Sequence, residues 1–597
     1  MASASRPLGS QRAAITSSDA APVTSQHLTI AALIPVLAAI AVYLPALRNG
    51  FVWDDPLVLQ QLRAIRSPAD LFVLPPSIPR YYFRPFIFIT YWFDRTLEGE
   101  VPYWFHASVI GWHALNTLLV FLLARRLFPT DWLIAGGGAL LFAVFPAHVE
   151  SVAWMAGRSD VIVCTFVLLT VLLAMQREQA WTAWAAGGTL LLALFSKELA
   201  VAALVLVPLL DLMSTGRLQW LRYAPLALAA VIYFVLRATA LAAVVGGLPT
   251  GAAPLQVVTE LLCATGFYVT RALVPIGLCP YIPAVPTSSL AHLLVGAVVP
   301  LAAVGLIGWA WRSGRWEPGF LAGWFFITVA PSLMVIVRRS ASAVLADRYL
   351  YLPSVASCLL LAWAFTRIAN SRRFGIRWPA LALAAVSLAW AAQAVPYTRV
   401  WTDNLTFWSA VTAHAPSDAL PYRELGTALI DHGRLDDAER ALQQAVTANA
   451  GPESRAMTYG NLGNLYRRQG RYDDALQAFE AGLKIGRHPI LYHNLGMTLM
   501  LKIEQEQHAG DQAVVLRDIT RARDAFEQAL RIGTAPNAPP TFRQEWDAAK
   551  THSLLGQVLF SMGDRAGARE HLDAALQLEP TGPTADLTRQ YRKQIGQ

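Results

Sequence analysis

The strongest constraint on this chain is a series of apolar segments before about residue 398, each close to the thickness of a membrane. A helix needs roughly 20 apolar residues to cross the hydrocarbon layer. Eleven segments qualify, at residues 28–47, 106–127, 132–148, 160–176, 180–195, 198–213, 220–242, 290–310, 318–336, 349–367 and 378–397. The pattern predicts an all-α, polytopic membrane bundle of about eleven spans.

The distribution of arginine predicts which loops face the cytoplasm, because short cytoplasmic loops are enriched in Lys and Arg. With a cytoplasmic N-terminus, the inner loops carry groups such as Arg125 and Arg126, and the segment 367–377 with four arginines. This assignment holds only if residues 257–274 do not span the membrane. That segment contains Glu260 and Arg271, and it either lies along the surface or re-enters. An odd number of spans places the polar C-terminal part outside.

Composition excludes several classes of protein. Hydrophobic residues make up 55% of the 597 residues, and the net charge is +8. The basic residues lie mostly in short loops between apolar segments, which indicates membrane topology and argues against nucleic-acid binding. The four cysteines lack the spacing of a disulfide frame or a zinc site. The run 27–47 is longer than a signal-peptide core and is expected to remain as an anchor.

The polar part of the chain contains a repeated pattern of helix pairs with the spacing of tetratricopeptide repeats. Each copy has a Leu-Gly pair in its first helix and small or bulky apolar residues at fixed positions in its second. The four pairs are Leu425-Gly426, Leu462-Gly463, Leu495-Gly496 and Leu555-Gly556. Four repeats are enough to stack into an α-solenoid, which usually presents a surface to a peptide or a protein. A rigid spacer or dimerisation element is the alternative.

Acidic and basic residues occur together in the segments predicted to lie outside, and polar groups beside spans are candidates for function. The set comprises Asp54, Asp55, Arg84, His148, Glu150, Arg158, Asp160, Lys197, Glu198, Arg338, Arg339, Asp347 and Arg348. Such a mixture suits transfer from an anionic lipid. Arginine and lysine hold a phosphate and stabilise it as it leaves, and a carboxylate accepts the proton of an incoming hydroxyl.

A structural interpretation stands beside the catalytic one. Charged neighbours such as Asp347 and Arg348 also form ion pairs that fix helix ends at the interface, and for any one pair this is the more frequent role. His148 and Glu150 do not have the spacing of a metal motif. The residues themselves predict no metal site.

At this point the motifs resemble a known family. In order along the chain they are "GFVWDD", "RP" at 84–85, "FHASVIGWHALNTLLVFLL", "FPAHVESVAWMAGRSD", "FSKELAVAALVLVPLLDL" and "DRYLYLPS", followed by the repeats. Together they resemble the transmembrane and tetratricopeptide repeat-containing (TMTC-like) O-mannosyltransferase-like proteins, within the GT-C glycosyltransferase superfamily. The match extends over nearly the whole chain from about residue 27.

The resemblance implies a glycosyltransferase that uses a polyprenyl-phosphate sugar as donor. Asp54 and Asp55 fall on its acidic motif, with Asp54 as the expected base. Arg348, Arg158, Lys197, Arg84 and Arg338 are expected to contact the phosphate or the sugar. Supporting polar roles are expected for His148, Glu150, Asp160, Glu198 and Asp347, the last of which stands where relatives often have Glu. No cofactor is required beyond the lipid-linked donor, and a divalent metal ion is left open.

The expected function is transfer of a hexose such as mannose to hydroxyl groups of exported proteins on the outer face of the membrane. The alternatives are transfer to a cell-envelope glycan or lipid, and a membrane-anchored scaffold without catalysis. We expect an inner-membrane protein of a bacterium with a periplasmic repeat domain, lumenal in a eukaryote. The expected domains are a cytoplasmic N-terminus (1–26), a transmembrane domain (27–398) with an outer loop (48–105), a linker (399–418), a repeat domain (419–582) and a tail (583–597).

Overall fold

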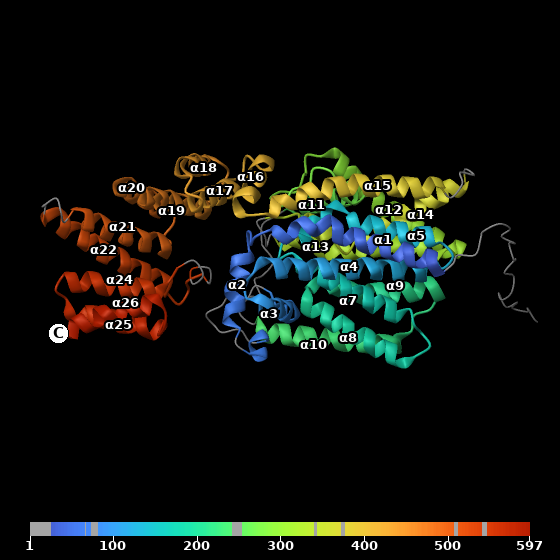
Figure 1. Cartoon of the computed structure of the whole chain (residues 1–597), viewed down its shortest axis with the longest axis horizontal. Helices are drawn as coiled ribbons and strands as arrows, with labels where there is room; N and C mark the ends of the chain where they lie inside the picture. Colours follow the sequence, from blue (N-terminus) through green and yellow to red (C-terminus); the bar gives the residue numbers. More distant parts are fainter. Residues whose placement is uncertain are drawn as a thin grey trace, which may run out of the picture.

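The fold is described by a computed structural model in which the polypeptide is helical from the first apolar segment to the last repeat (Figure 1). The described residues are 25–65, 67–72, 82–241, 253–338, 343–371, 377–506, 512–539, 542 and 546–596. The N-terminal residues 1–24 and Arg339 lie outside them. The predicted all-α class is confirmed, since the described residues contain helices and two isolated β-bridges but no strand.

The first part of the chain forms a bundle whose long helices run side by side (Figure 1). Its helices are α1 (Ser25–Tyr43), α2 (Asp55–Ala64), α3 (Pro85–Glu98), α4 (Pro102–Leu127), α5 (Trp132–Val144), α6 (Val149–Val152), α7 (Arg158–Ala174), α8 (Ala180–Ser196), α9 (Ala203–Thr215), α10 (Ala224–Ala240), α11 (Pro254–Leu273), α12 (Leu290–Ser313), α13 (Trp316–Arg338), α14 (Ser354–Ser371) and α15 (Arg377–Tyr397). Short 3₁₀ helices connect them at η1 (Leu44–Arg48), η2 (Pro68–Leu71), η3 (Pro146–His148), η4 (Glu198–Ala202), η5 (Trp220–Tyr223), η6 (Asp347–Leu350) and η7 (Thr398–Trp401).

All eleven predicted spans are helical, but fewer of them have the length of a full span. Within the described part of the chain, seven helices are long and apolar enough to cross a membrane, or eight if the bent pair from Trp132 to Val152 counts as one. The difference arises because segments such as α7 and α8 contain only 17 residues each. Residues 257–274, which were predicted to lie along the surface or to re-enter, fall almost entirely in α11. This helix is not among the seven that are long and apolar enough to span.

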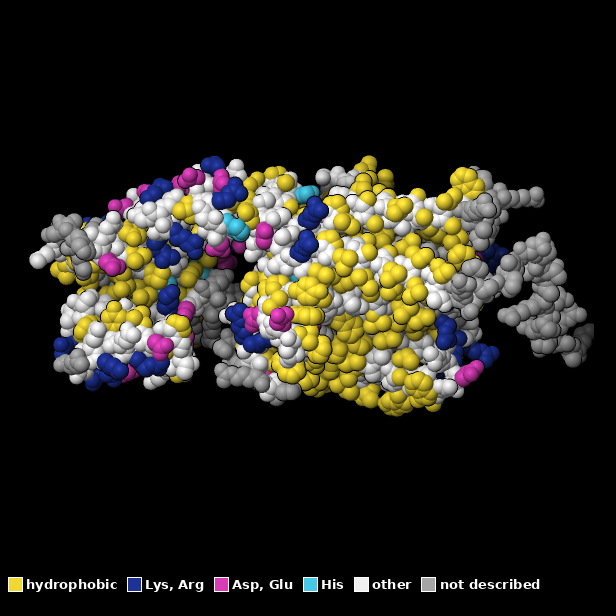
Figure 2. Space-filling model, in the orientation of Figure 1, with side chains coloured by type: hydrophobic (Ala, Val, Ile, Leu, Met, Phe, Trp, Pro, Cys, Tyr) yellow, Lys and Arg dark blue, Asp and Glu magenta, His cyan; other side chains and the backbone are white. Residues whose placement is uncertain are grey.

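The surface of the bundle is that of a membrane protein. Apolar side chains cover its sides in a continuous band, and charged side chains gather at its ends (Figure 2). The exposed apolar residues include Leu301 and Val304 of α12, whose side chains would be costly to leave in water. Together with the long apolar helices, this band supports a membrane protein, as predicted.

The second part of the chain is a stack of helix pairs at one end of the bundle (Figure 1). Its helices are α16 (Asn404–His414), α17 (Ala419–Asp431), α18 (Leu435–Thr447), α19 (Pro452–Arg468), α20 (Tyr472–Ile485), α21 (Pro489–Glu506), α22 (Gln512–Gly533), α24 (Ala548–Ser561), α25 (Arg565–Leu578) and α26 (Pro583–Gly596). The segment expected to be a linker contains η7 and α16, and the segment after the repeats contains α26.

The four predicted Leu-Gly pairs occupy equivalent places in this stack. A Cβ atom on Gly463 would lie 2.6 Å from the ring of Phe479, and one on Gly496 would lie 2.7 Å from that of Phe526. Gly426 and Gly556 lie equally close to a leucine of the second helix in their pairs. Only glycine allows the two helices of each pair to pack this closely, which explains the spacing recognised in the sequence.

Candidate active site

The two adjacent aspartates of the first loop have different environments. Asp55 lies in the first turn of α2 and is fully buried. Its two carboxyl oxygens accept hydrogen bonds from the backbone N–H groups of Val52 and Ala156, both at 2.9 Å. Burial raises the pKa of the Asp55 carboxyl to about 8, and these two donors oppose the shift. Asp55 therefore joins the first loop to the segment before α7.

Asp54 is exposed and precedes α2 directly. Its carboxylate has no hydrogen-bond or ion-pair partner among the described residues. Nearby protein partly desolvates the group, which raises its pKa, and the positive charge of Arg348 opposes that shift. Asp54 is thus a carboxylate that faces solvent, where a general base can reach the proton of an incoming hydroxyl, and it lies within electrostatic reach of Arg348.

Trp53 fixes the backbone directly before Asp54. Its φ angle is +54°, a left-handed conformation that is strained for a bulky residue. The indole stacks on Trp154 with ring centroids 5.1 Å apart, and the backbone N–H donates to Oδ1 of Asn404 at 2.9 Å. Phe407 of α16 also contacts the indole. The turn that carries Asp54 and Asp55, called the acidic turn below, is therefore held by the bundle on one side and by α16 on the other.

Arg348, whose charge acts on Asp54, forms an ion pair with Glu150. The guanidinium of Arg348 pairs with Oε1 of Glu150, and the backbone N–H of Arg348 donates to Oε2 at 2.9 Å. Glu150 is fully buried, whereas 15% of the Arg348 side chain is exposed. The guanidinium also lies over the rings of Trp154 and Tyr349, at 5.4 and 5.1 Å. Arg348 keeps an open edge toward solvent.

Lys197 approaches the same tyrosine as Arg348. Its ammonium nitrogen lies 5.5 Å from the centroid of the Tyr349 ring and 2.5 Å from Oδ1 of Asp160. Lys197 and Arg348, which are far apart in the sequence, therefore converge on Tyr349. Two cations with an aromatic ring between them form a surface suited to a phosphate and a sugar.

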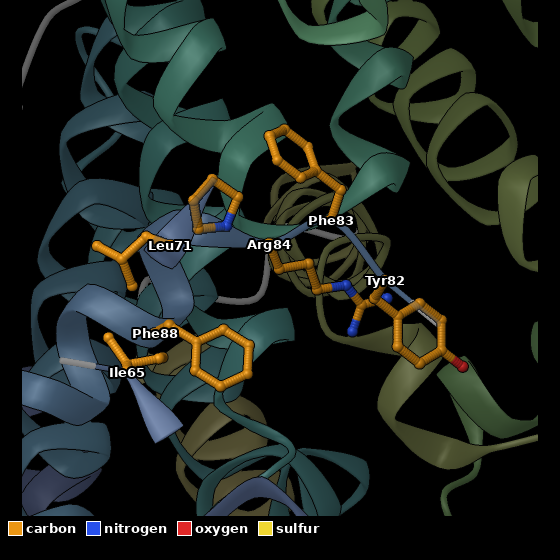
Figure 3. A pocket seen from close by; sticks show the side chains of 7 residues that line it. Ile65, Leu71, Tyr82, Phe83, Arg84 and Phe88 are labelled. Carbon is orange, nitrogen blue, oxygen red and sulfur yellow. The ribbon is translucent and has the colours of Figure 1, made fainter. Parts of the chain in front are cut away.

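A third cation, Arg84, lies next to this surface. Its Nε donates to Oε2 of Glu198 at 3.1 Å, and its guanidinium lies 4.1 Å from the ring centroid of Tyr82. Figure 3 shows Arg84 directed toward Tyr82 in a small pocket that Phe83 and Phe88 also line. Charge interactions connect Arg84 to both Asp160 and Lys197. Arg84, Lys197 and Arg348 therefore lie close together, and we call these three residues the basic cluster.

Two other predicted residues, Arg158 and Asp347, are structural in this conformation. Arg158 is fully buried, with Nη1 2.5 Å from Oδ2 of Asp94 and Nη2 donating to the backbone oxygen of Phe105. Asp347 is also buried, and its Oδ1 lies 3.1 Å from Nε of Arg271. Burial raises the pKa of Asp347 to about 7, which the charge of Arg271 opposes. Neither residue presents a polar atom to solvent.

The two remaining predicted residues form no hydrogen bond, ion pair or ring contact with the acidic turn among the described residues. His148 is buried in the bundle, where Nε2 forms a 2.7 Å hydrogen bond with Oγ of Ser354. Arg338 is exposed at the end of α13 and has no ion pair with another described residue. Among the residues that the structure describes, no three His, Cys, Asp or Glu side chains gather to hold a metal ion.

Four residues join the site that sequence reasoning did not assign to it. Tyr349 and Trp154 supply the rings under the cations, and Asn404 holds the acidic turn. Arg237 of α10 donates to the hydroxyl of Tyr233 at 3.1 Å and acts electrostatically on Glu198. It has no carboxylate within ion-pair distance in the described structure. Tyr349 and Trp154 lie within the motifs "DRYLYLPS" and "FPAHVESVAWMAGRSD", which are the sequence signals available for these residues.

Comparison with family models confirms the repeats. Models described as "Tetratricopeptide repeat" match residues 417–488 and 549–581. The repeat domain predicted from the Leu-Gly spacing therefore consists of tetratricopeptide repeats over these ranges.

Comparison with curated proteins finds relatives of the predicted kind. "Protein O-mannosyl-transferase Tmtc1" of Drosophila melanogaster is 34% identical over 209 residues, which are 32% of this chain and 24% of that protein. "Protein O-mannosyl-transferase F38B6.6" of Caenorhabditis elegans is 23% identical over 439 residues, 69% of this chain and 62% of that protein. These names confirm the resemblance drawn from the motifs. The chain spans about a quarter of the first of these relatives.

Solved structures give only a weak likeness. One titled "Crystal structure of YrrB: a TPR protein with an unusual peptide-binding site" is 22% identical, with 31% of this chain and 97% of that chain covered. The TM-score is 0.18, which does not establish a shared arrangement of helices.

Proposed function

We propose that this chain is a membrane glycosyltransferase of the GT-C type that moves a hexose such as mannose from a polyprenyl-phosphate carrier to hydroxyl groups of proteins. The names of the curated relatives support protein O-mannosylation. The apolar band of the bundle supports a donor that arrives from the lipid phase. The sugar-phosphate end of such a donor would reach the end of the bundle where the acidic turn and the basic cluster lie.

One observation carries the proposal: Asp54 is the one carboxylate of the described site that has no hydrogen-bond or ion-pair partner. Glu150, Asp160 and Glu198 each pair with a cation of the basic cluster. Asp94 and Asp347 pair with Arg158 and Arg271, and Asp55 accepts two backbone hydrogen bonds. A purely structural acid would be expected to have a partner as well. Asp54 is exposed and free to accept a proton.

The reaction follows from this arrangement. Asp54 removes the proton of the acceptor hydroxyl, whose oxygen attacks the anomeric carbon of the sugar. The bond between that carbon and the phosphate oxygen breaks, and the lipid phosphate leaves with the bonding electrons. Arg84, Lys197 and Arg348 stabilise the negative charge that develops on the leaving phosphate. Arg237 adds a cation that helps to bind the phosphate of the donor. A single displacement of this kind inverts the configuration at the anomeric carbon.

The orientation of the chain is part of the proposal. We place the N-terminus in the cytoplasm and the repeats in the outer compartment, the periplasm of a bacterium or the lumen in a eukaryotic cell. The acidic turn and the repeats lie at the same end of the bundle, so both would face that compartment (Figure 1). The repeat domain would then bind the acceptor protein or a partner close to Asp54.

The test is transfer by purified full-length protein in proteoliposomes. The donor is polyprenyl-phosphate mannose with a labelled sugar, and the acceptors are peptides containing serine and threonine. Labelled peptide with an inverted sugar linkage, identified by mass spectrometry and glycosidase digestion, is the expected product. Label found only in glycan or lipid fractions would redirect the proposal to another acceptor. Absence of transfer with every polyprenyl-phosphate sugar would favour a scaffold without catalysis.

A further inference from the structure

Tyr281, in the loop between α11 and α12, connects the bundle to the repeat domain. Its side chain is buried, and its hydroxyl donates to Oδ2 of Asp418 at 3.0 Å. The other carboxyl oxygen of Asp418 caps α17 by accepting from the backbone N–H of Leu420 at 3.0 Å. Because α17 is the first helix of the first repeat, Asp418 fixes the beginning of the repeat domain, and Tyr281 holds that carboxylate to the bundle.

The ring of the same tyrosine lies against the acidic turn. Its centroid is 6.4 Å from that of the Trp53 ring, in an edge-to-face arrangement. The φ angle of Trp53 is left-handed and strained, so the turn depends on contacts of this kind to keep its conformation. One side chain therefore contacts both the residue before Asp54 and the beginning of the repeats.

The backbone on either side of Tyr281 is joined to the segment that carries Arg348. Ile282 forms an antiparallel β-bridge with Leu345, which lies shortly before Arg348 in the sequence. On the other side of Tyr281, a backbone N–H donates to Oδ2 of Asp347 at 3.3 Å. A shift of this loop would therefore also displace the backbone that carries a member of the basic cluster.

We propose that Tyr281 is a positioning residue that holds the acidic turn and the first repeat in a fixed relation. The hydroxyl anchors the ring to Asp418, and the anchored ring supports Trp53 and thereby the backbone before Asp54. An acceptor bound to the repeats would then meet Asp54 in a defined geometry. This consequence for transfer rests on the proposed function, whereas the connection between the two parts of the molecule does not.

The connection is tested by hydrogen-deuterium exchange of the full-length protein in nanodiscs, measured by mass spectrometry. The N–H groups of Val52, Trp53 and Asp55 are hydrogen-bonded in the acidic turn, so their exchange reports its opening. Tyr281→Phe keeps the ring but removes the hydroxyl. We expect exchange in the acidic turn to become about threefold faster or more in this variant, which corresponds to the loss of one hydrogen bond.

Tyr422→Phe provides the matched control. Tyr422 also belongs to the first repeat, in α17, and its hydroxyl has no hydrogen-bond partner among the described residues. Exchange in the acidic turn should be unchanged in this variant. An unchanged acidic turn in Tyr281→Phe, or an equal increase in Tyr422→Phe, would overturn the inference.

Variants of Asp418 show whether the effect passes through the tyrosine hydroxyl. Asp418→Asn keeps an oxygen for the N–H of Leu420 and presents an NH₂ group to the oxygen of Tyr281, so exchange should stay close to that of the unmodified protein. Asp418→Ala should open the acidic turn as Tyr281→Phe does. Combining Asp418→Ala with Tyr281→Phe should add little further exchange, because both remove the same hydrogen bond. Fully additive effects would overturn the inference.

Transfer gives a second readout, one that a merely structural residue would not change. We expect Tyr281→Phe to lower kcat about threefold or more with an unchanged KM for the lipid-linked donor, because the acidic turn is less well held. An unchanged kcat, or a rise in the donor KM alone, would overturn the positioning role. Absence of transfer by the unmodified protein would contradict the proposed function, and the exchange experiment would still decide whether Tyr281 holds the acidic turn.

Discussion

The backbone N–H of Trp53 donates a 2.9 Å hydrogen bond to Oδ1 of Asn404, which joins the acidic turn to the first helix after the membrane bundle. The two residues are 351 positions apart in the sequence. Since Trp53 also has a strained φ angle, the turn needs such external contacts to keep its conformation. Part of the repeat-bearing segment is therefore part of the structure that orients Asp54.

The first prediction concerns this contact. Asn404→Ala leaves the Trp53 N–H without its acceptor and is expected to cost about 1–3 kcal/mol of stability. We also expect kcat for transfer to fall by about tenfold or more, because Asp54 is no longer held in place. Asn404→Asp keeps an acceptor oxygen and should restore most of the rate. Ser409→Ala, on the exposed side of α16, is the control, and an equal loss in that variant would show that α16 as a whole is responsible.

The second prediction separates the two aspartates. Asp55→Asn replaces one of the two accepting carboxyl oxygens with an NH₂ group, which cannot accept a hydrogen bond. The backbone N–H of either Val52 or Ala156 therefore loses its acceptor. We expect thermal unfolding in detergent to show a loss of about 1–3 kcal/mol. Asp54→Asn should leave the unfolding temperature nearly unchanged, since its carboxylate has no hydrogen-bond or ion-pair partner among the described residues. Equal stability losses in the two variants would contradict this division of roles.

The third prediction concerns Arg237, the cation that sequence reasoning missed. Arg237→Gln removes a positive charge near Glu198 but no ion pair between described residues. We expect KM for the lipid-linked donor to rise by about tenfold with little change in kcat. Arg315→Gln, in the loop between α12 and α13, provides the control. A change in kcat alone would assign Arg237 a role in the transition state instead.

The fourth prediction is a pH dependence. A base must be deprotonated to act, so transfer at saturating donor should fall as the pH drops through the pKa of Asp54. Partial desolvation raises that pKa above its ordinary value of 3.8, against the opposing charge of Arg348. Arg348→Gln removes the opposing charge and should shift the acid limb of the profile to higher pH. An unchanged acid limb would show that Arg348 does not act on the base, and a shift to lower pH would contradict the sign of the predicted effect.

Much of the architecture could be predicted because it depends on local patterns. Apolar length predicted the helices of the bundle, and the Leu-Gly pairs predicted the repeats. The number of full spans could not be obtained in the same way. Most residues of α7 are buried by neighbouring helices, and apolar composition does not distinguish this from contact with lipid.

The residues of the site could be predicted from the sequence, but the ion pairs and ring contacts that they form could not. The sequence indicates that Asp54, Lys197 and Arg348 belong to outer segments, but their partners come from distant elements. Lys197 and Arg348 meet at Tyr349 only in the folded chain. Arg158 has the same chemistry as Arg348, yet its guanidinium is buried against Asp94. Which arginine remains open to a ligand depends on tertiary packing, which spacing alone does not reveal.

The most direct test of the central claim compares Asp54→Asn with Asp436→Asn in the same single-turnover transfer assay. Asp436 is an exposed aspartate of α18 and provides the matched loss of one carboxylate. Both variants should show the unfolding temperature of the unmodified protein. If Asp54 is the base, transfer from polyprenyl-phosphate mannose falls by about 100-fold or more in Asp54→Asn and is unchanged in Asp436→Asn. Full transfer by a folded Asp54→Asn variant would contradict the account.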